Sequence, residues 1–298
     1  MAFQSNVIGV VKRSPLESAI ALLLLFLYGP LLWHWVDGWL NKSISIQHEY
    51  FSHGLLGIPF AFYIAWSQRK AWAELPDRWN PIGLGIVALA VVFYLSSLSD
   101  SMNLSFPLLL VGLCLCLKGR AGLRMEAFPL VLITLATPTQ LPYLIEPYVL
   151  PLQHFIASVA GFLLVQFGLD VRVETIYLFV NGQTVEVAPH CAGLKMLFTS
   201  LYVALMLLYW TGLCSSRLRT GLFLAGTVTI SILGNILRNT LLSYFHGTGN
   251  HAAFDWLHEY WGGDLYSAIM LLSLVGLIHL IQQFVPKTLD LGSSPSVV

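Results

Sequence analysis

Three side chains that together could carry out acyl transfer lie in three separate stretches of the sequence. They are the thiol of Cys191, the guanidinium of Arg238 and the imidazole of His258. A thiolate can attack a carbonyl carbon, and an imidazole can move the protons that such an attack requires. A guanidinium stays charged and can stabilise an oxyanion or orient a carboxylate. The set is chemically complete if the fold brings the three stretches together.

Cys191 lies in the run APHCAG (residues 188–193), directly before an apolar segment. At the N-terminus of a helix, the dipole and the free backbone N–H groups favour a thiolate and could hold an oxyanion. The alternative is a small residue that packs at a helix start. The other cysteines, Cys114, Cys116 and Cys214, are expected to be small core residues.

Arg238 lies inside a long apolar run, where an arginine costs roughly 2.5–3.5 kcal/mol on insertion scales. It is six residues from Tyr244, so one alternative is that its side chain snorkels to the membrane surface. Asn235 precedes it by one turn and shares its helix face. Because snorkelling needs no asparagine, the pair favours a site that faces the interior of a helix bundle.

The stretch 246–264 is rich in histidine and tryptophan, and helical spacing places His251, Asp255 and His258 on one face. Three interpretations stay open: an interfacial helix with an aromatic belt, a zinc site that includes His246, and a histidine that acts as the base for Cys191. No HExxH pattern occurs. We therefore expect no metal and no cofactor.

The composition indicates a membrane protein. Of 298 residues, 56% are hydrophobic and 10% are charged, and the formal net charge is zero. These values exclude an ordinary cytosolic enzyme, a disordered chain and a nucleic-acid binder. The sequence predicts an all-α polytopic fold in one domain over residues 1–298, with flexible ends at 1–15 and 288–298. About eight transmembrane helices are expected, at 18–35, 51–67, 82–99, 104–117, 127–141, 194–211, 220–244 and 265–285.

The basic residues orient these spans with both termini in the cytoplasm. Only four of the 15 Lys and Arg residues then lie outside or at the outer ends of spans: Lys42, Arg172, Lys195 and Arg238. The segment 149–169 is also apolar enough to span. A ninth span there would place Arg217 and Arg219 on the outer side of the membrane, against the positive-inside rule. We therefore expect a re-entrant or interfacial segment. Residues 171–187 alternate around Asn181-Gly182, which predicts an extracytoplasmic β-hairpin.

At these residues the sequence resembles the exosortase/archaeosortase family of membrane transpeptidases. The resemblance rests on CAG (191–193), NILR (235–238), HEYWG (258–262) and an earlier SHG (52–54). Lys195 stands where relatives often have Arg, and His190 offers a second imidazole that could compete with His258. The likeness extends from about residue 20 to 285.

The resemblance implies cleavage of C-terminal sorting signals of PEP-CTERM-type proteins on the extracytoplasmic face of a bacterial inner membrane. Cys191 would form an acyl-thioester, and Arg238 and His258 would share proton transfer and charge stabilisation. His258 is the better acid–base on pKa grounds. The supporting or substrate-binding residues would be Asn235, Gly193, Lys195, His190 and His53. The partners would be membrane-anchored substrate proteins and membrane lipid, with no nucleic acid.

Three other functions compete with this interpretation. An intramembrane cysteine protease would release its product to water without transfer. A transporter would use Arg238 and Asn235 as a binding site near the membrane midplane. A metallohydrolase would use the histidines of residues 246–258.

Overall fold

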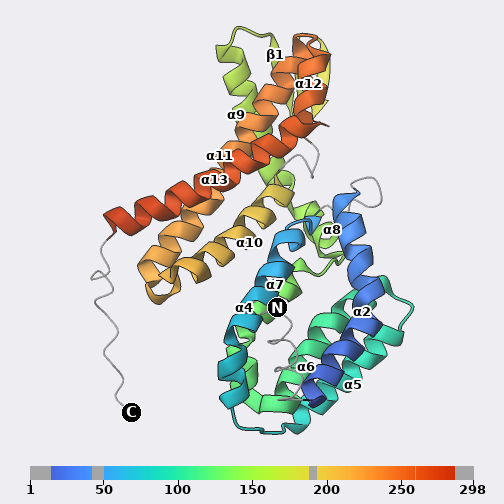
Figure 1. Ribbon diagram of the computed structural model, residues 1–298. Helices are drawn as coiled ribbons and strands as arrows, with labels where there is room; N and C mark the ends of the chain where they lie inside the picture. Colours follow the sequence, from blue (N-terminus) through green and yellow to red (C-terminus); the bar gives the residue numbers. More distant parts are fainter. Residues whose placement is uncertain (1–14, 42–49, 188–192, 259, 286–298) are drawn as a thin grey trace, which may run out of the picture. The chain divides into compact units, whose positions relative to one another are not determined.

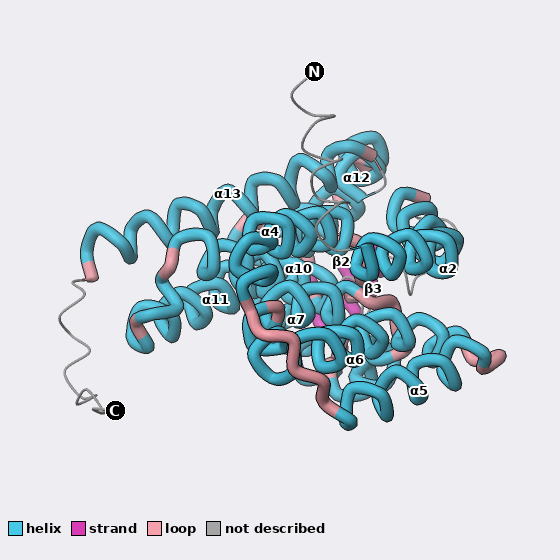
Figure 2. Tube along the Cα trace, turned by 60° about the horizontal axis from the view of Figure 1, so that its bottom comes forward, coloured by secondary structure: helices cyan, strands magenta, loops and turns pink. Residues whose placement is uncertain are grey.

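Helices make up 81% of the computed structural model, which describes residues 15–41, 50–187, 193–258 and 260–285 (Figure 2). The chain forms two compact units, residues 1–139 and 140–298. The predicted flexible ends lie outside the described residues, apart from Pro15, which begins the first helix.

Five helices are described in the first unit, within residues 15–41 and 50–139. They are α2 (Pro15–Leu40), α4 (Gly54–Glu74), α5 (Pro81–Leu95), α6 (Ser99–Met125) and α7 (Ala127–Ala136). Buried side-chain hydrogen bonds hold α2 to α6. The indole of Trp35 donates to the Asn103 side chain over 2.8 Å, and Asn103 in turn donates to the carbonyl of Pro138 over 3.0 Å. In an apolar environment such satisfied polar pairs specify which helices are neighbours.

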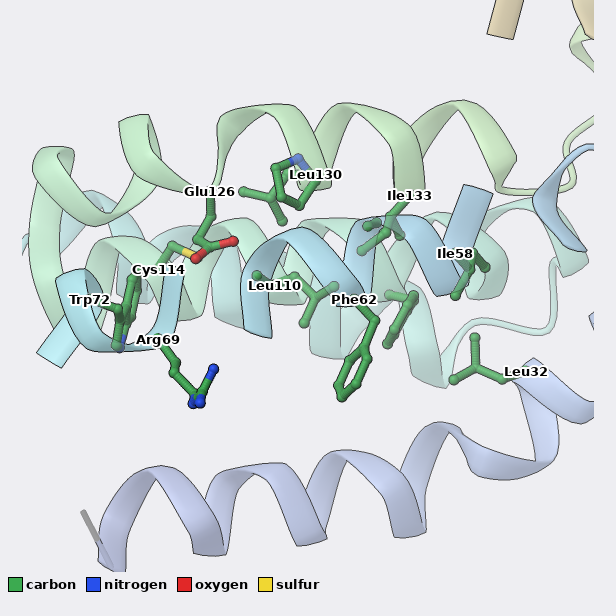
Figure 3. A pocket seen from close by; sticks show the side chains of 14 residues that line it. Leu32, Ile58, Phe62, Arg69, Trp72, Leu110, Cys114, Glu126, Leu130 and Ile133 are labelled. Carbon is green, nitrogen blue, oxygen red and sulfur yellow. The ribbon is translucent and has the colours of Figure 1, made fainter. Parts of the chain in front are cut away.

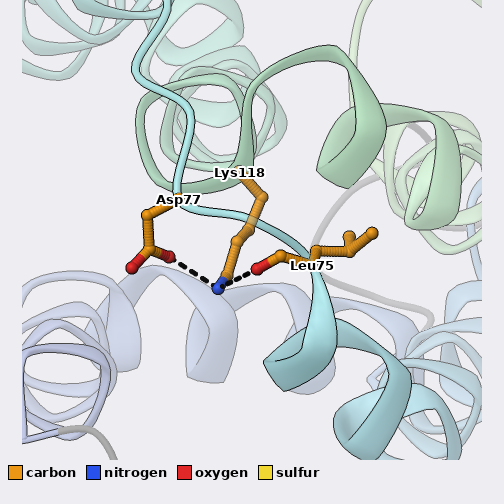
Figure 4. Close-up of polar contacts among 3 residues, drawn as sticks. All are labelled: Leu75, Asp77 and Lys118. Carbon is orange, nitrogen blue, oxygen red and sulfur yellow. Dashed lines mark hydrogen bonds and ion pairs between the residues drawn. The ribbon is translucent and has the colours of Figure 1, made fainter.

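A buried lysine holds the connection between α4 and α5 against α6. The Lys118 ammonium lies 2.6 Å from an Asp77 carboxylate oxygen and donates to the Leu75 carbonyl over 2.9 Å (Figure 4). The Lys118 side chain is 7% exposed, whereas that of Asp77 is 88% exposed. The next residue, Gly119, interrupts helix α6 with a φ of 61°, where an added Cβ would lie 2.8 Å from the Arg78 carbonyl oxygen.

The second unit begins with short elements and continues with long helices (Figure 1). Its elements are α8 (Leu141–Ile145), η1 (Glu146–Tyr148), α9 (Leu150–Gln166), β1 (Val171–Glu174), β2 (Tyr177–Val180), β3 (Gln183–Glu186), α10 (Leu194–Thr211), η2 (Leu213–Ser215), α11 (Arg217–Gly247), α12 (His251–His258) and α13 (Trp261–Phe284). An apolar core joins α10, α11 and α13, with Leu208, Phe223 and Leu274 all at most 2% exposed.

The predicted hairpin forms and is extended by one more strand. β2 and β3 pair antiparallel through a two-residue turn at Asn181 and Gly182, whose φ values are 49° and 82°. β1 pairs with the other side of β2 through a second turn, in which Thr175 has a φ of 56°. The sheet packs on α9 and on the end of α11, because Gly161 lies against Val173 and Gly247 lies against Val180.

Each of the eight predicted spans contains a helix, but five of the described helices are long and apolar enough to cross a membrane: α2, α6, α10, α11 and α13. Two others are short. α5 ends at Leu95, before a serine pair, and α7 ends at Ala136, where Pro138 forces the preceding residue into an extended conformation. The segment 149–169 forms α9, which packs on α11 and contacts Tyr244 through Phe167.

Candidate active site

The start of helix α10 lies directly on helix α11. Gly193 caps α10 in the left-handed conformation, with φ 84° and ψ 10°. A Cβ atom at this position would lie 2.6 Å from Cγ and 2.8 Å from Nδ2 of Asn235. Both the backbone angle and the close approach therefore require glycine. The contact brings the CAG and NILR stretches together, as a site built from both requires.

The side chain of Asn235 is buried without hydrogen bonds. It is 1% exposed, and neither its Nδ2 nor its Oδ1 has a hydrogen-bond partner within the described ranges. A buried polar group left unsatisfied costs about 1–3 kcal/mol. Its backbone carbonyl, by contrast, accepts a hydrogen bond from the Asn239 side chain over 2.9 Å. A free amide in this place is a candidate for binding a substrate.

Arg238 lies one turn further along α11 and is half-buried. On the neighbouring helix α13, the Tyr266 hydroxyl donates a hydrogen bond to the carbonyl of Gly234. Gly234 also packs against Met270, so α13 crosses α11 next to Asn235. Three helices therefore meet around Asn235 and Arg238.

In all three helices, the meeting point lies at nearly the same distance from the opposite end of the helix. Arg219 donates to the Val285 carbonyl and so joins α11 and α13 at the opposite end. Nineteen residues separate Arg219 from Arg238 and also Tyr266 from Val285, which corresponds to about 29 Å of helix. The 18 residues of α10 cover about 27 Å. All three lengths are close to the roughly 30 Å thickness of a bilayer's hydrocarbon core.

His251 begins helix α12 and His258 ends it, and both are exposed. The His258 ring stacks on Phe254 at 5.3 Å between ring centres. The His246 ring also lies 5.3 Å from the Phe254 ring and 6.0 Å from the His251 ring. Within the described residues, no three His, Cys, Asp or Glu side chains form a group that could hold a metal ion.

Two predicted site residues, His190 and Cys191, lie outside the described residues, so their gathering with Arg238 and His258 stays a prediction. Lys195 is half-buried in the first turn of α10. Arg172, one of the four basic residues assigned to the outer side, forms an ion pair with Glu174.

His53 belongs to the first unit and has structural contacts there. It is 6% exposed, and its Nε2 atom lies 3.2 Å from the carbonyl oxygen of Leu135 at the end of α7. The following Gly54 lies against Trp39, whose ring would be 2.5 Å from an added Cβ. The SHG stretch thus joins α2, α4 and α7.

Comparison with models of known families identifies the family of the chain. A family model described as transmembrane exosortase matches residues 33–275, which is most of the chain. The match includes every predicted site residue. No curated protein and no solved structure matches.

Proposed function

Because this multi-pass membrane chain belongs to the transmembrane exosortase family, whose members are sorting transpeptidases or peptidases, we propose that it cleaves C-terminal sorting signals through an acyl-thioester on Cys191. The substrates are membrane-anchored proteins with a PEP-CTERM-type signal. The reaction takes place on the extracytoplasmic face of a bacterial inner membrane, both termini are cytoplasmic, and residues 1–298 act as one domain.

The contact between Gly193 and Asn235 is the observation that carries this proposal. Cys191 is two residues before Gly193, a separation of at most about 7 Å along an extended chain. Gly193 in turn touches the side-chain amide of Asn235. The buried amide, the start of α10 and the proposed nucleophile therefore belong to one small region.

The length of helix α11 supports an extracytoplasmic position for the site around Asn235 and Arg238. Arg217 and Arg219 begin α11 and fit the positive-inside rule. One bilayer thickness further along this helix lie Asn235 and Arg238. The rest of α11 continues beyond that level to Gly247, where the sheet packs on it. The sheet and α12 would then lie outside the membrane.

The proposed reaction proceeds in two steps, acylation of Cys191 and transfer of the acyl group to an acceptor. The Cys191 thiolate attacks the scissile carbonyl carbon, a C–S bond forms, the C–N bond breaks, and the leaving amine takes a proton from the His258 imidazolium. An acceptor nucleophile then gives its proton to the imidazole and attacks the thioester, which regenerates the thiolate. Arg238 and the Asn235 amide stabilise the oxyanion in both steps.

The remaining site residues have supporting roles. Gly193 permits the close approach of α10 to α11, and Lys195 provides positive charge for an acidic sorting motif. His190 is an alternative proton carrier, and His53 supports the first unit through its contact with Leu135. Hydrolysis in place of transfer would use the same thioester.

Trapping the intermediate tests the proposal. Wild-type protein co-expressed with a PEP-CTERM-tailed substrate should give a hydroxylamine-sensitive adduct on Cys191, and Cys191→Ala should give neither adduct nor cleavage. Cys214→Ala, which changes an exposed cysteine at the opposite end of α10, is the matched control. Cleavage by Cys191→Ala would reject the nucleophile and favour the metal-dependent alternative, whereas absence of cleavage by the wild type as well would favour the transporter.

A further inference from the structure

The first unit encloses an elongated apolar cavity of about 470 Å³ between α2, α4, α6 and α7 (Figure 3). Leu32, Ile58 and Ile133 line one end, and Arg69, Trp72 and Glu126 line the other. From Ile58 to Trp72, helix α4 rises about 21 Å. The cavity is therefore long enough for an extended hydrocarbon chain along the helices.

The cavity opens to the surroundings of the helices. Phe62 lines it and is 68% exposed, and Arg69 is also exposed. In a chain that lies in a membrane, these surroundings are lipid. An apolar space connected to lipid fills with hydrocarbon, because an empty one loses dispersion contacts and water finds few polar partners there.

One end of the cavity carries two opposite charges that do not bond to each other. The Arg69 guanidinium donates one hydrogen bond to the Trp66 carbonyl over 2.8 Å and lies 4.8 Å from the centre of the Trp66 ring. The remaining N–H groups of a guanidinium suit a phosphate group. The opposite charge belongs to Glu126, and the Arg69 and Glu126 side chains lie at the same end of the cavity (Figure 3).

The Glu126 carboxyl is half-buried at the junction of α6 and α7, near Cys114. Among the described residues it has neither a hydrogen-bond partner nor an ion-pair partner through its side chain. Burial removes water from the charged form and so raises the pKa of this carboxyl. A cationic group in the cavity would restore that stabilisation.

We propose that this cavity binds a zwitterionic phospholipid with a primary-ammonium headgroup. One acyl chain lies along the apolar wall, the phosphate contacts Arg69, and the ammonium contacts Glu126. A purely anionic lipid would satisfy Arg69 but would place a negative headgroup beside a second negative charge. Glu126 follows Arg120 and Arg124 in the sequence, and basic residues at the end of an apolar helix mark the headgroup level of the proposed cytoplasmic leaflet.

Lipid retention by the purified full-length protein provides the test. Protein extracted in mild detergent and exchanged into mixed vesicles of phosphatidylethanolamine and phosphatidylglycerol is analysed by native mass spectrometry. The wild type should keep one phosphatidylethanolamine molecule in preference to phosphatidylglycerol. Glu126→Gln should lower this preference about tenfold, the value of one charge-assisted hydrogen bond. Arg69→Gln should reduce retention of both lipids.

Two further variants separate binding from folding. Arg217→Gln removes an exposed arginine of the second unit that does not line the cavity, and it should retain lipid like the wild type. Ala65→Phe fills the cavity and should prevent retention while the protein remains monodisperse. Absence of retained lipid in the wild type, equal retention of both lipids, or an unchanged preference in Glu126→Gln would each overturn the proposal. Its outcome does not depend on the chemistry of Cys191.

Discussion

Gly193 lies so close to Asn235 that a methyl group in place of the glycine hydrogen would be 2.6 Å from the Asn235 Cγ atom. The two residues are 42 positions apart and belong to different helices. Their contact fixes where α10 begins relative to α11. A side chain at either position therefore affects both the packing of these helices and the position of the segment before Gly193.

Gly193→Ala should reduce both stability and turnover. A left-handed conformation costs a non-glycine residue about 1–2 kcal/mol, and the clash with Asn235 adds to this. Gly221→Ala on the exposed face of α11 is the control, because no atom lies within 4 Å of its Cβ position. It should be neutral or stabilising by about 0.4–1 kcal/mol. Thermal unfolding and substrate cleavage measure both effects, and equal behaviour of the two variants would contradict the contact.

Asn235→Leu should separate stability from activity. The buried amide has no hydrogen-bond partner in the part of the chain that the structure describes, so its removal should leave unfolding unchanged or shifted upward. Turnover should fall about 10²–10³-fold if the amide stabilises an oxyanion. A variant that loses stability but keeps its turnover number would assign Asn235 a purely structural role.

His258→Gln should reduce turnover about 10²–10⁴-fold and change the shape of the pH profile of turnover, because the proposed proton carrier is removed. His251→Gln is the matched control, because His251 is exposed on the same helix. It should keep both the rate and the pH profile. If His258→Gln keeps the wild-type profile, the proton carrier is another residue, with His190 the next to test.

Asp77→Asn and Lys118→Met should have unequal effects on stability. Removing the exposed carboxylate leaves the buried Lys118 ammonium with only the Leu75 carbonyl, so Asp77→Asn should cost about 1–3 kcal/mol. Lys118→Met removes the buried charge itself and should cost less. A double-mutant cycle in thermal unfolding measures the coupling, and additive effects would show that the ion pair is without energetic consequence.

Loss of the Glu126 proton should lower the free energy of unfolding of the lipid-free protein as pH rises. Its pKa is raised above the usual 4.5 in the folded state, so the folded protein binds more protons than the unfolded protein between the two pKa values. Stability then declines as pH increases from about 4.5 through the raised pKa. Cys114 and Arg69 are the other ionisable groups among the residues that line the cavity. Glu126→Gln should remove this decline in detergent, and an identical slope in both proteins would contradict it.

The local features of the fold could be predicted well from the sequence. Asn181-Gly182 predicted the turn between β2 and β3, because these residues readily adopt positive φ angles. The second turn, at Thr175, was missed because neither Thr175 nor Ile176 carries a turn signal. The apolar runs located the helices, but the ends of α5 and α7 depended on a serine pair and a proline whose effects a hydropathy pattern does not include.

The spatial relationships could be predicted only in part. The resemblance to exosortases paired the CAG and NILR stretches, yet nothing in either stretch showed that Gly193 touches Asn235. Arg69 lies inside α4 and Glu126 lies between α6 and α7, and each alone is an ordinary charged residue. Their common cavity depends on helix packing, which single-sequence periodicity does not specify.

Helix α11 is continuous over 31 residues, about 46 Å, and so extends well past the thickness of a bilayer. The sheet at its far end is consequently held at a set height above the point where Asn235 meets Gly193. A rigid support of this kind acts as a ruler. If the proposed cleavage takes place at this point, we expect a substrate whose recognition motif is moved by a few residues relative to its hydrophobic segment to present the wrong peptide bond and to be cleaved more slowly.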